Sequence, residues 1–294
     1  MHFELESTIS YVQRYHLVYW FIAVQVFWSC TKEDAPNLLV ENNQENAPLN
    51  LGNLTNATTN TTQAHNYLIH HYAYTIAQNN QISYSLSYNN QRRIPNWIAW
   101  HFQGTDKGLV SRQDDFREDT KLPTGWYRVN ETSYTGSGFD RGHNCPSADR
   151  TASIEANSGT FIMTNIIPQA PDLNRGVWAD LEQFIRDTVS ANDLEVYTFM
   201  GNYGQGGYNS SNSLTNTIDN GNITVPAYVW KVVVFLERGE DDLTRMTKYT
   251  RTLTVVMPNN NVPVDWREYI TSINNLEKQS AQAGLTLSLS LIHI

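Results

Sequence analysis

The chain has 294 residues, of which 40% are hydrophobic, and it carries a formal net charge of -9 at pH 7. This length and composition allow a globular protein with a sizeable buried core, arranged as one large or two small domains. The acidic balance argues against wholesale electrostatic attraction to nucleic acid, because a polyanionic backbone favours basic partners. Local arginines would have to supply any grip on nucleic acid.

An apolar run near the start of the chain, residues 17–28, predicts the core of a signal peptide, because it is too short to span a bilayer comfortably. Arg14 supplies a charge before the run. Cys30 follows a small residue, as the lipidation cysteine of bacterial lipoproteins does. Residues 31–34 (TKED) resemble the signal that sends lipoproteins of some Gram-negative lineages to the cell surface.

We therefore expect residues 1–30 to be a signal peptide of lipoprotein type, with Cys30 as a lipid anchor that tethers the chain without spanning the membrane. The protein would be exported to the outer membrane or cell surface. With a plain cleaved signal it would instead be periplasmic or extracellular. A buried N-terminal helix with an ordinary cysteine is the other interpretation.

Residues 31–64 are rich in Asn, Thr and Gln, and they show almost no aromatic or aliphatic periodicity. This composition predicts a flexible tether. We expect the folded domain to occupy residues 65–280 and to begin near Asn66.

The first predicted elements of the domain are two strands of a hairpin, residues 82–88 and 97–102, separated by the polar turn 89–91. The charged stretch 112–119 that follows is of the kind that usually forms a solvated loop. Residues 151–159 favour a short helix, and the apolar run 160–164 favours a buried strand.

A longer amphipathic helix is predicted from Val177 to about Asn192, because its apolar residues recur every three or four positions. Strands rich in Val, Tyr, Trp and Phe are then expected at residues 194–201, 228–236 and 252–257. A closing helix is predicted over residues 265–278, with Trp266, Ile270, Ile273 and Leu276 on one face.

The end of the chain, residues 285–294, alternates apolar and polar residues like an edge strand. Its last six residues, LSLIHI, are also what a common sequencing-transposon end gives when translated in frame. We hypothesise that this segment is artefactual and that adapter sequence truncated the gene.

The densest grouping of reactive side chains is the stretch 139–150, FDRGHNCPSADR, in which an acid, a guanidinium and an imidazole surround Gly142. A glycine at such a place lets the backbone turn tightly or approach a ligand closely. Cys145 lies two residues after His143, but a solitary thiol lacks the companions that a metal site or a thiol nucleophile needs.

A second stretch, residues 165–182, passes from a loop marked by prolines into the amphipathic helix. Asn174, Glu182 and Arg186 are spaced by multiples of four, so the helix would turn them slowly around one side, toward one cleft. Taken alone, Asn174 could merely cap the helix, and Glu182 and Arg186 could merely form a solvated salt bridge.

Together these side chains suit phosphodiester hydrolysis better than acyl transfer. Guanidinium groups at Arg112, Arg141 and Arg186 match the anionic oxygens of a transferring phosphoryl group. A neutral His143 can take a proton from the attacking water. Hydrated Mg2+ accepts few protein oxygens, so the Asn174 carboxamide could hold it, with Glu182 reached through water.

The two motifs, Asp140-Arg-Gly-His143 with PSADR, and Asn165-x-x-Pro-Gln169 with Asn174-x-Gly-x-Trp178, resemble those of the DNA/RNA non-specific endonuclease family. The resemblance covers roughly residues 51–277. It implies an α+β fold with a central antiparallel sheet flanked by helices and a ββα-metal (His-Me finger) nuclease core.

The resemblance also implies a role for each matching residue. His143 is the general base, and Asn174 is the sole direct protein ligand of a hydrated Mg2+ that Mn2+ can replace. Arg112 and Arg186 stabilise the transition state, and Arg141 and Glu182 lie near the metal. Asp140 and Asn165 serve the orientation and architecture of the site, whereas Asp149 and Arg150 are expected to fix the local turn.

The implied activity is cleavage of single- and double-stranded DNA and RNA, leaving 5'-phosphate ends. Contacts mainly to phosphate and sugar would explain tolerance of base sequence. A metal phosphodiesterase acting on small nucleotides and a non-catalytic surface lipoprotein that binds nucleic acid are the alternatives. The sequence leaves open the biological role, the oligomeric state and whether an inhibitor protein protects the producing cell.

Overall fold

The computed structural model describes residues 65–72, 82–239, 242–247, 249–261, 264–285 and 287. The predicted signal peptide, the anchor at Cys30 and the tether lie outside these residues. So does most of the segment 285–294, of which only Leu285 and Leu287 are described. The first described strand begins at Asn66.

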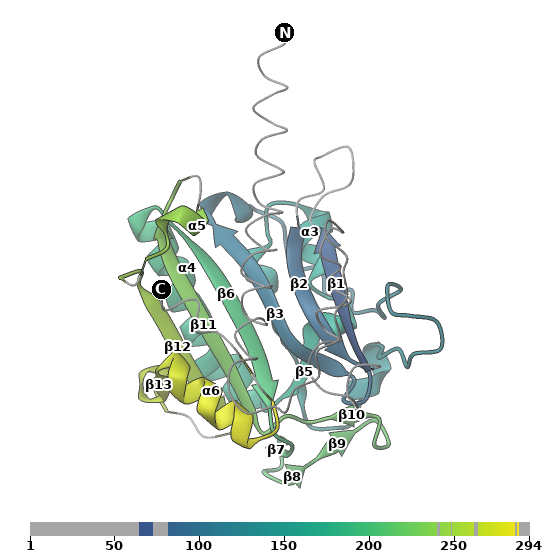
Figure 1. The fold of residues 1–294 in the computed structure, drawn as a ribbon. Coiled ribbons are helices and arrows are strands. Elements are labelled where there is room, and N and C mark those ends of the chain that lie inside the picture. The colour runs from purple at the N-terminus through teal and green to yellow at the C-terminus, as the bar shows by residue number, and fades with distance from the viewer. Residues whose placement is uncertain are drawn as a thin grey trace, which may run out of the picture.

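A seven-stranded antiparallel sheet forms the centre of the domain, with the strand order β1-β2-β3-β6-β11-β12-β13 (Figure 1). The strands are β1 (Asn66–Tyr72), β2 (Ile82–Asn89), β3 (Ile94–Gln103), β6 (Leu194–Tyr203), β11 (Tyr228–Glu237), β12 (Thr252–Pro258) and β13 (Ile270–Thr271). The predicted hairpin is confirmed, since β2 pairs antiparallel with β3. The strands predicted at 194–201, 228–236 and 252–257 are confirmed as β6, β11 and β12.

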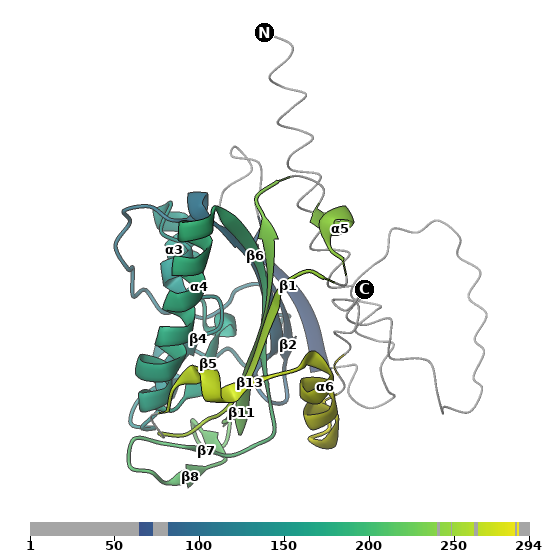
Figure 2. The same ribbon diagram turned by 90° about the vertical axis from the view of Figure 1, so that its left-hand side faces the viewer.

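Helices cover both faces of this sheet, and Figure 2 shows them on opposite sides. The inner face packs against α3 (Ile154–Gly159), α4 (Trp178–Asn192) and the hairpin of β4 (Asp140–His143) with β5 (Ile166–Gln169). The outer face carries α6 (Ile273–Gln282) and the short α5 (Asp242–Arg245). The fold is therefore α+β, with a central antiparallel sheet flanked by helices.

The side chains of β11 alternate between the two faces of the sheet, so this strand contributes to the core on each face. Val229 and Val233 belong to the inner core beneath α4, whereas Trp230 and Val232 belong to an outer cluster shared with α6. Successive side chains of a strand point to opposite faces, so both faces of a central strand can be buried. This explains why the strand reads as an almost continuous apolar run.

The amphipathic helix α4 follows the predicted pattern closely. Trp178, Leu181, Ile185 and Val189 are buried against the inner face. The helix ends at Asp193, whose left-handed backbone (φ 48°) lets its N–H bond to the Val189 carbonyl. Burial of one apolar stripe, together with this end, positions the polar residues of α4 over the sheet.

Two predicted elements are wrong. Residues 160–164 do not form a strand of the sheet: Phe161 and Met163 are buried, but their backbone bonds run to Arg117 and to the end of α3. The predicted helix 265–278 is interrupted, because Ile270 and Thr271 pair with β12 as β13 and Ser272 caps a new helix, α6.

The interruption lets this last segment wrap around the edge of the sheet. Trp266 packs on Phe184 of α4 at the inner face, with ring centroids 4.8 Å apart. Ile273 and Leu276, predicted on the same helical face as Trp266, lie instead in the outer cluster.

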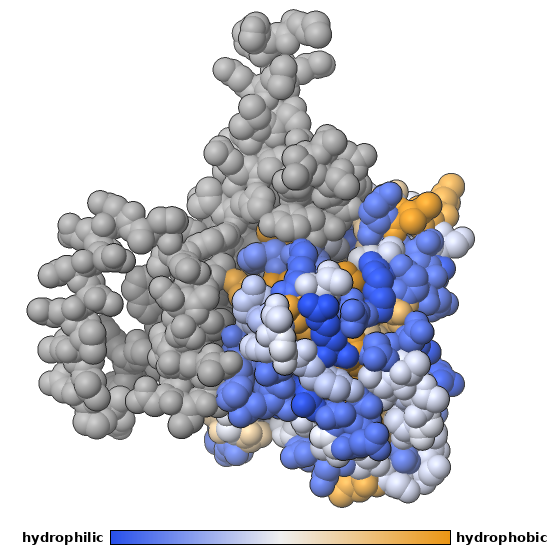
Figure 3. Space-filling model, turned by 90° about the vertical axis from the view of Figure 1, so that its right-hand side faces the viewer, coloured by the Kyte–Doolittle hydropathy of each residue, from blue (hydrophilic) through white to orange (hydrophobic). Residues whose placement is uncertain are grey.

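Short hairpins close one end of the domain, built by β7 (Gly207–Tyr208) with β8 (Leu214–Thr215) and β9 (Thr217–Ile218) with β10 (Ile223–Thr224). None of the helices within the described ranges is long and apolar enough to cross a membrane. The described part of the face seen in Figure 3 is mainly hydrophilic, with small scattered apolar patches.

Candidate active site

The site is built on a ββα unit, in which the β4–β5 hairpin is followed by a wide helical turn (Leu173–Val177) and α4. β4 carries Asp140 and His143 at its two ends. Gly142 lets the strands approach closely, because a Cβ at this position would lie 2.2 Å from Oε1 of Gln169. The glycine of the motif is therefore required by packing within the hairpin.

His143 lies between two phenylalanines. Its ring centroid is 5.5 Å from that of Phe116 and 4.9 Å from that of Phe161. The ring is half-buried, and its Nε2 atom is inaccessible and has no hydrogen-bond partner among the described residues. Burial, followed by the guanidinium groups of Arg112 and Arg141, lowers the pKa of His143 to about 3. The imidazole is thus neutral at neutral pH, and one of its two nitrogens carries a lone pair that can accept a proton.

The two arginines beside His143 rest on the same phenylalanines. The guanidinium of Arg112 lies 4.7 Å from the Phe161 centroid, and that of Arg141 lies 4.3 Å from the Phe116 centroid. Arg112 also donates to Asp114 and to Ser147. Both arginines are exposed, so they flank the histidine with positive charge that an anionic ligand could reach.

The loop that carries Arg112 and Phe116 was expected to be a solvated charge run, but the structure pins it. Asp119 at its end is buried and accepts hydrogen bonds from His71 (2.9 Å) and Thr164 (2.6 Å). Gln113 donates its backbone N–H to the Asn157 side chain. These anchors hold the loop beside the β4–β5 hairpin.

Asn174 lies in the wide turn before α4 and does not cap the helix. Its Nδ2 donates to Oδ2 of Asp140 at 2.9 Å. Asp140 also binds the guanidinium of Arg175, which is mainly exposed, through both carboxylate oxygens. The capping interpretation is wrong because the N-cap of α4 is Val177 and no side chain caps the helix there.

These residues fit a hydrated hard cation. Among the described residues no cluster of three or more His, Cys, Asp or Glu side chains could hold a metal ion. An ion that keeps most of its waters needs only a few protein oxygens. The orientation of Asn174 by Asp140 leaves a carboxamide oxygen of the type that Mg2+ prefers.

Glu182 makes an ion pair that the sequence analysis did not anticipate. Oε1 of Glu182 accepts a hydrogen bond from Nζ of Lys231 on β11 at 3.0 Å. Burial raises the pKa of Glu182, and the charge of Lys231 opposes this rise. The sequence feature that could have revealed this pair is a single lysine, Lys231, inside an apolar strand between Trp230 and Val232. A charge there must either face solvent or meet a partner across the core.

Arg186 points to a different partner than its spacing suggested. It is only 8% exposed, and it donates to Oδ1 of Asp149 at 3.1 Å and to the side chain of Gln183. The i,i+4 salt bridge with Glu182 is therefore wrong: each residue pairs with a group outside α4. Trp100 donates to the other oxygen of Asp149 at 3.0 Å, so this pair is tied to the sheet.

Three further motif residues are buried in the framework. Asn165 donates to the carbonyls of Cys145 and Thr160 and accepts from the N–H of Cys145. Arg150 donates to backbone carbonyls of Ser83, Asp149 and His101. Burial raises the pKa of the Cys145 thiol to about 12, so it is no nucleophile at neutral pH.

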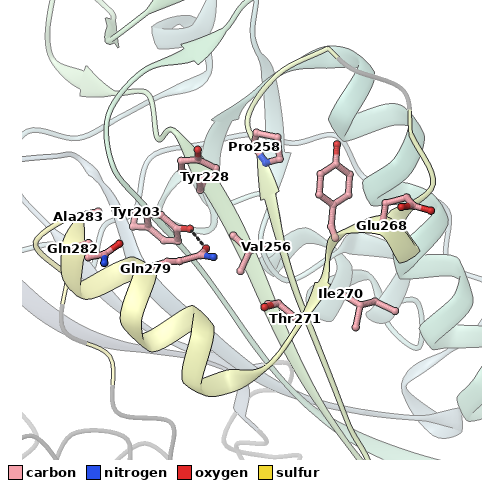
Figure 4. A pocket seen from close by; sticks show the side chains of 11 residues that line it. Tyr203, Tyr228, Val256, Pro258, Glu268, Ile270, Thr271, Gln279, Gln282 and Ala283 are labelled. Carbon is pink, nitrogen blue, oxygen red and sulfur yellow. Dashed lines mark hydrogen bonds between the residues drawn. The ribbon is translucent and has the colours of Figure 1, made fainter.

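A groove of about 600 Å³ lies away from these residues, between α6 and the ends of β6, β11 and β12 (Figure 4). Tyr203 and Tyr228 stack in it with centroids 5.1 Å apart, and Tyr203 donates to Gln279 at 2.9 Å. None of the described residues lining it is basic. The groove therefore offers no cation to a phosphate.

Comparison with known proteins agrees with this geometry. Residues 63–290 match the DNA/RNA non-specific endonuclease family. The chain is 39% identical over 257 residues to a nuclease of Nostoc sp., covering 87% of this chain and 86% of that protein. It is 30% identical to human mitochondrial endonuclease G over 67% of this chain and 66% of that protein.

The fold also resembles a chain in the crystal structure of the EndoG/EndoGI complex, with a TM-score of 0.57 and 24% identity, covering 72% of this chain and 84% of that chain. The family is metal-dependent. From the sequence match and the ββα site we conclude that this chain belongs to the DNA/RNA non-specific endonuclease family and is a hydrolase that acts as a nuclease.

Proposed function

We propose that the protein is an exported, Mg2+-dependent endonuclease that cuts both DNA and RNA, with His143 as its general base. The observation that carries this proposal is the neutral His143, whose buried Nε2 has no partner among the described residues. Arg112 and Arg141 flank it on two phenylalanines. A neutral imidazole beside two guanidinium groups suits attack on a phosphodiester.

In this mechanism the imidazole of His143 takes a proton from the attacking water, which makes the water a better nucleophile. The phenylalanine rings of Phe116 and Phe161 fix the plane of the imidazole and limit its hydration. Departure of the 3' oxygen from phosphorus leaves a 5'-phosphate on one product. The leaving oxygen takes up a proton to become the 3' hydroxyl.

Arg112 and Arg141 bind the non-bridging oxygens of the scissile phosphate, whose negative charge grows toward the transition state. Burial, and after it the positive charge of Arg112 and Arg141, lowers the pKa of His143 in the free protein, and a bound phosphate offsets that charge. The base therefore becomes stronger when substrate is present. Arg186, held by Asp149, adds positive charge from the inner side of α4.

Oδ1 of Asn174 would hold the hydrated Mg2+, and Glu182 would reach it through water, with Mn2+ as a substitute. When bound, the metal supplies positive charge that neutralises the phosphate and the leaving oxygen. Asp140 orients Asn174 by accepting its amide N–H, and Arg175 in turn fixes Asp140. The role of the chain here is to present one oxygen in one orientation.

Contacts of this kind to phosphate and sugar do not distinguish one base from another, which supports a nonspecific nuclease. The acidic total charge is compatible with this, because the exposed arginines gather beside His143. We further propose export through the signal at residues 1–30, with Cys30 as a lipid anchor. Acylation is tested by mass spectrometry of the mature N-terminus.

The decisive experiment incubates residues 31–294 with supercoiled plasmid and with RNA, each in Mg2+ and in EDTA. We expect metal-dependent loss of both polymers and products that accept a ligase without phosphorylation, which requires 5'-phosphate ends. A protein that retards but does not cut them would be a binder. One that cleaves only small nucleotide diesters would be a phosphodiesterase of another substrate class.

A further inference from the structure

Lys231 is the one charged side chain that β11 turns toward the inner core. Its neighbours on that face, Val229 and Val233, are completely buried. The side chain of Lys231 itself is 1% exposed. Across the sheet it pairs with Met200 of β6 and Val255 of β12, which are also buried. An ammonium group thus occupies the centre of an apolar layer.

The surroundings of this ammonium are specific. Nζ of Lys231 donates to Oε1 of Glu182 at 3.0 Å. It lies 4.6 Å from the ring centroid of Trp178 and 5.5 Å from that of Trp100. The aromatic faces offer a negative potential where water is excluded, and they leave the carboxylate as the strong hydrogen-bond acceptor.

Stability alone does not explain such an arrangement. Removing two charges from water costs free energy, and apolar residues of similar volume often replace a buried ion pair without loss of stability. A methionine would fill this slot beside Val229 and Val233 without that cost. What methionine cannot do is fix the rotamer of Glu182 through one carboxylate oxygen.

The other oxygen of Glu182 remains available. Oε2 accepts no hydrogen bond from any residue that the structure describes, and the side chain is 14% exposed. Lys231 therefore immobilises the carboxylate from the sheet side and leaves one oxygen toward the side on which Glu182 is open. This is the action of an outer partner that orients a carboxylate at a metal centre.

We propose that Lys231 is a positioning residue for catalysis, which holds Glu182 so that its free oxygen can bind the water shell of the cation. The inference rests on the proposed function. It extends the site from α4 to the centre of the sheet, through a residue that touches neither substrate nor metal. Lys231 acts only through Glu182.

The test compares Lys231→Met, Glu182→Gln and the double variant in the full domain. We expect Lys231→Met to lower kcat by about 10- to 100-fold and to weaken Mn2+ binding, followed by electron paramagnetic resonance, by a similar factor. The double variant should be no worse than Glu182→Gln. Lys231→Arg, which keeps a charged donor, should retain more Mn2+ affinity than Lys231→Met.

Val233→Ala is the matched control, since this residue lies on the same face of β11 and makes no polar contact. It should lower the unfolding temperature and leave kcat and Mn2+ affinity unchanged. The inference is overturned if Lys231→Met binds Mn2+ and cuts like the wild type. It is also overturned if the double variant loses kcat by the product of the two single-variant losses. If Lys231→Met does not fold, Lys231→Arg decides the question: a folded Lys231→Arg with Mn2+ affinity and kcat as low as those of Glu182→Gln would also overturn the inference. If wild-type protein fails to cut plasmid, the proposed function itself is wrong.

Discussion

The two faces of the central sheet are built from the same strands but differ in what they bury. On β11, Trp230 and Val232 point to an outer cluster that is apolar, whereas Lys231 points to an inner core that holds ion pairs. The inner core also buries Arg186 with Asp149. The outer face buries a carboxylate too, since Glu195 pairs with His101 and Arg245. Buried ions are costly on either face, and only those of the inner face lie on the side that carries the His143 site.

The grooves and surfaces of the two faces differ in the same way. The outer groove is lined by stacked tyrosines and an acidic residue, Glu268, without a basic side chain among the described residues lining it. The inner side presents Arg112 and Arg141 beside His143. A polyanionic substrate therefore finds complementary charge on the inner side.

The largest effect expected from this contrast is at His143. Replacement by alanine removes the proton acceptor, so kcat/KM on plasmid should fall by about 10²- to 10⁴-fold. Because Nε2 makes no hydrogen bond to any described residue, the fold should survive. Plasmid nicking and circular dichroism measure the two quantities. A His143→Ala protein that is folded and fully active would remove the histidine from the mechanism.

Asn174→Ala should have the next largest effect, on metal dependence. It removes the proposed ligand oxygen. The metal concentration that gives the half-maximal rate should therefore rise by at least about 10- to 100-fold, which is the cost of losing an outer partner of a metal site. Asn192→Ala at the far end of α4 serves as the control, since its amide only bonds to Thr188. Equal metal dependence of the two variants would refute the assignment.

Gly142→Ala tests the framework of the inner side. A Cβ would lie 2.2 Å from Oε1 and 2.7 Å from Cβ of Gln169, so strand β4 must shift. Overpacking of this kind costs about 1–3 kcal/mol in the free energy of unfolding. In Gly159→Ala the new methyl group meets no atom within 4 Å, and the unfolding temperature should change less. Thermal melts of both variants decide the point.

A smaller effect is expected in the pH dependence. The pKa of His143 is lowered to about 3 in the free protein, and protonation inactivates a base. The acidic limb of kcat/KM should therefore lie below pH 6.5, the ordinary value for histidine. Bound phosphate offsets Arg112 and Arg141, so the limb of kcat should lie at higher pH than that of kcat/KM. Coincident limbs at pH 6.5 would contradict this.

The smallest effect is expected on the outer face. Tyr228→Ala should cost about 0.5–1.5 kcal/mol of stability, from lost stacking on Tyr203, and leave nuclease activity at the wild-type rate. Loss of activity without loss of fold would show that the groove takes part in substrate binding. Chemical denaturation and plasmid nicking of the same preparation separate these results.

Much of the fold was predictable from the composition and spacing of apolar residues within each element. The stripe of Trp178, Leu181, Ile185 and Val189 predicted α4, and a high content of Val, Tyr, Trp and Phe predicted β6, β11 and β12. The closing helix was wrong because spacing cannot reveal that Trp266 and Ile273 lie on opposite faces of the sheet. The segment between Trp266 and Ile273 crosses the edge of the sheet because Ile270 and Thr271 pair with β12, and such a long-range pairing is not visible in local spacing.

The site was predictable in its residue types and less so in its contacts. Motif spacing brought Asp140, His143 and Asn174 together, as the hairpin and its following turn require. The roles assigned to these residues stay predictions. Asn174 as a cap was wrong because α4 begins after Val177. The Glu182 pair with Arg186 was wrong because Lys231 comes from a distant strand. Such partners leave no periodic signal.

The most direct test of the account is chemical rescue of His143→Ala with imidazole. The account predicts that added imidazole restores cleavage of plasmid in Mg2+, in proportion to the concentration of its free base, because the vacated space beside Phe116 and Phe161 lacks only a proton acceptor. Cleavage that remains absent at every imidazole concentration in a folded, metal-binding variant would contradict the assignment of His143 as the general base.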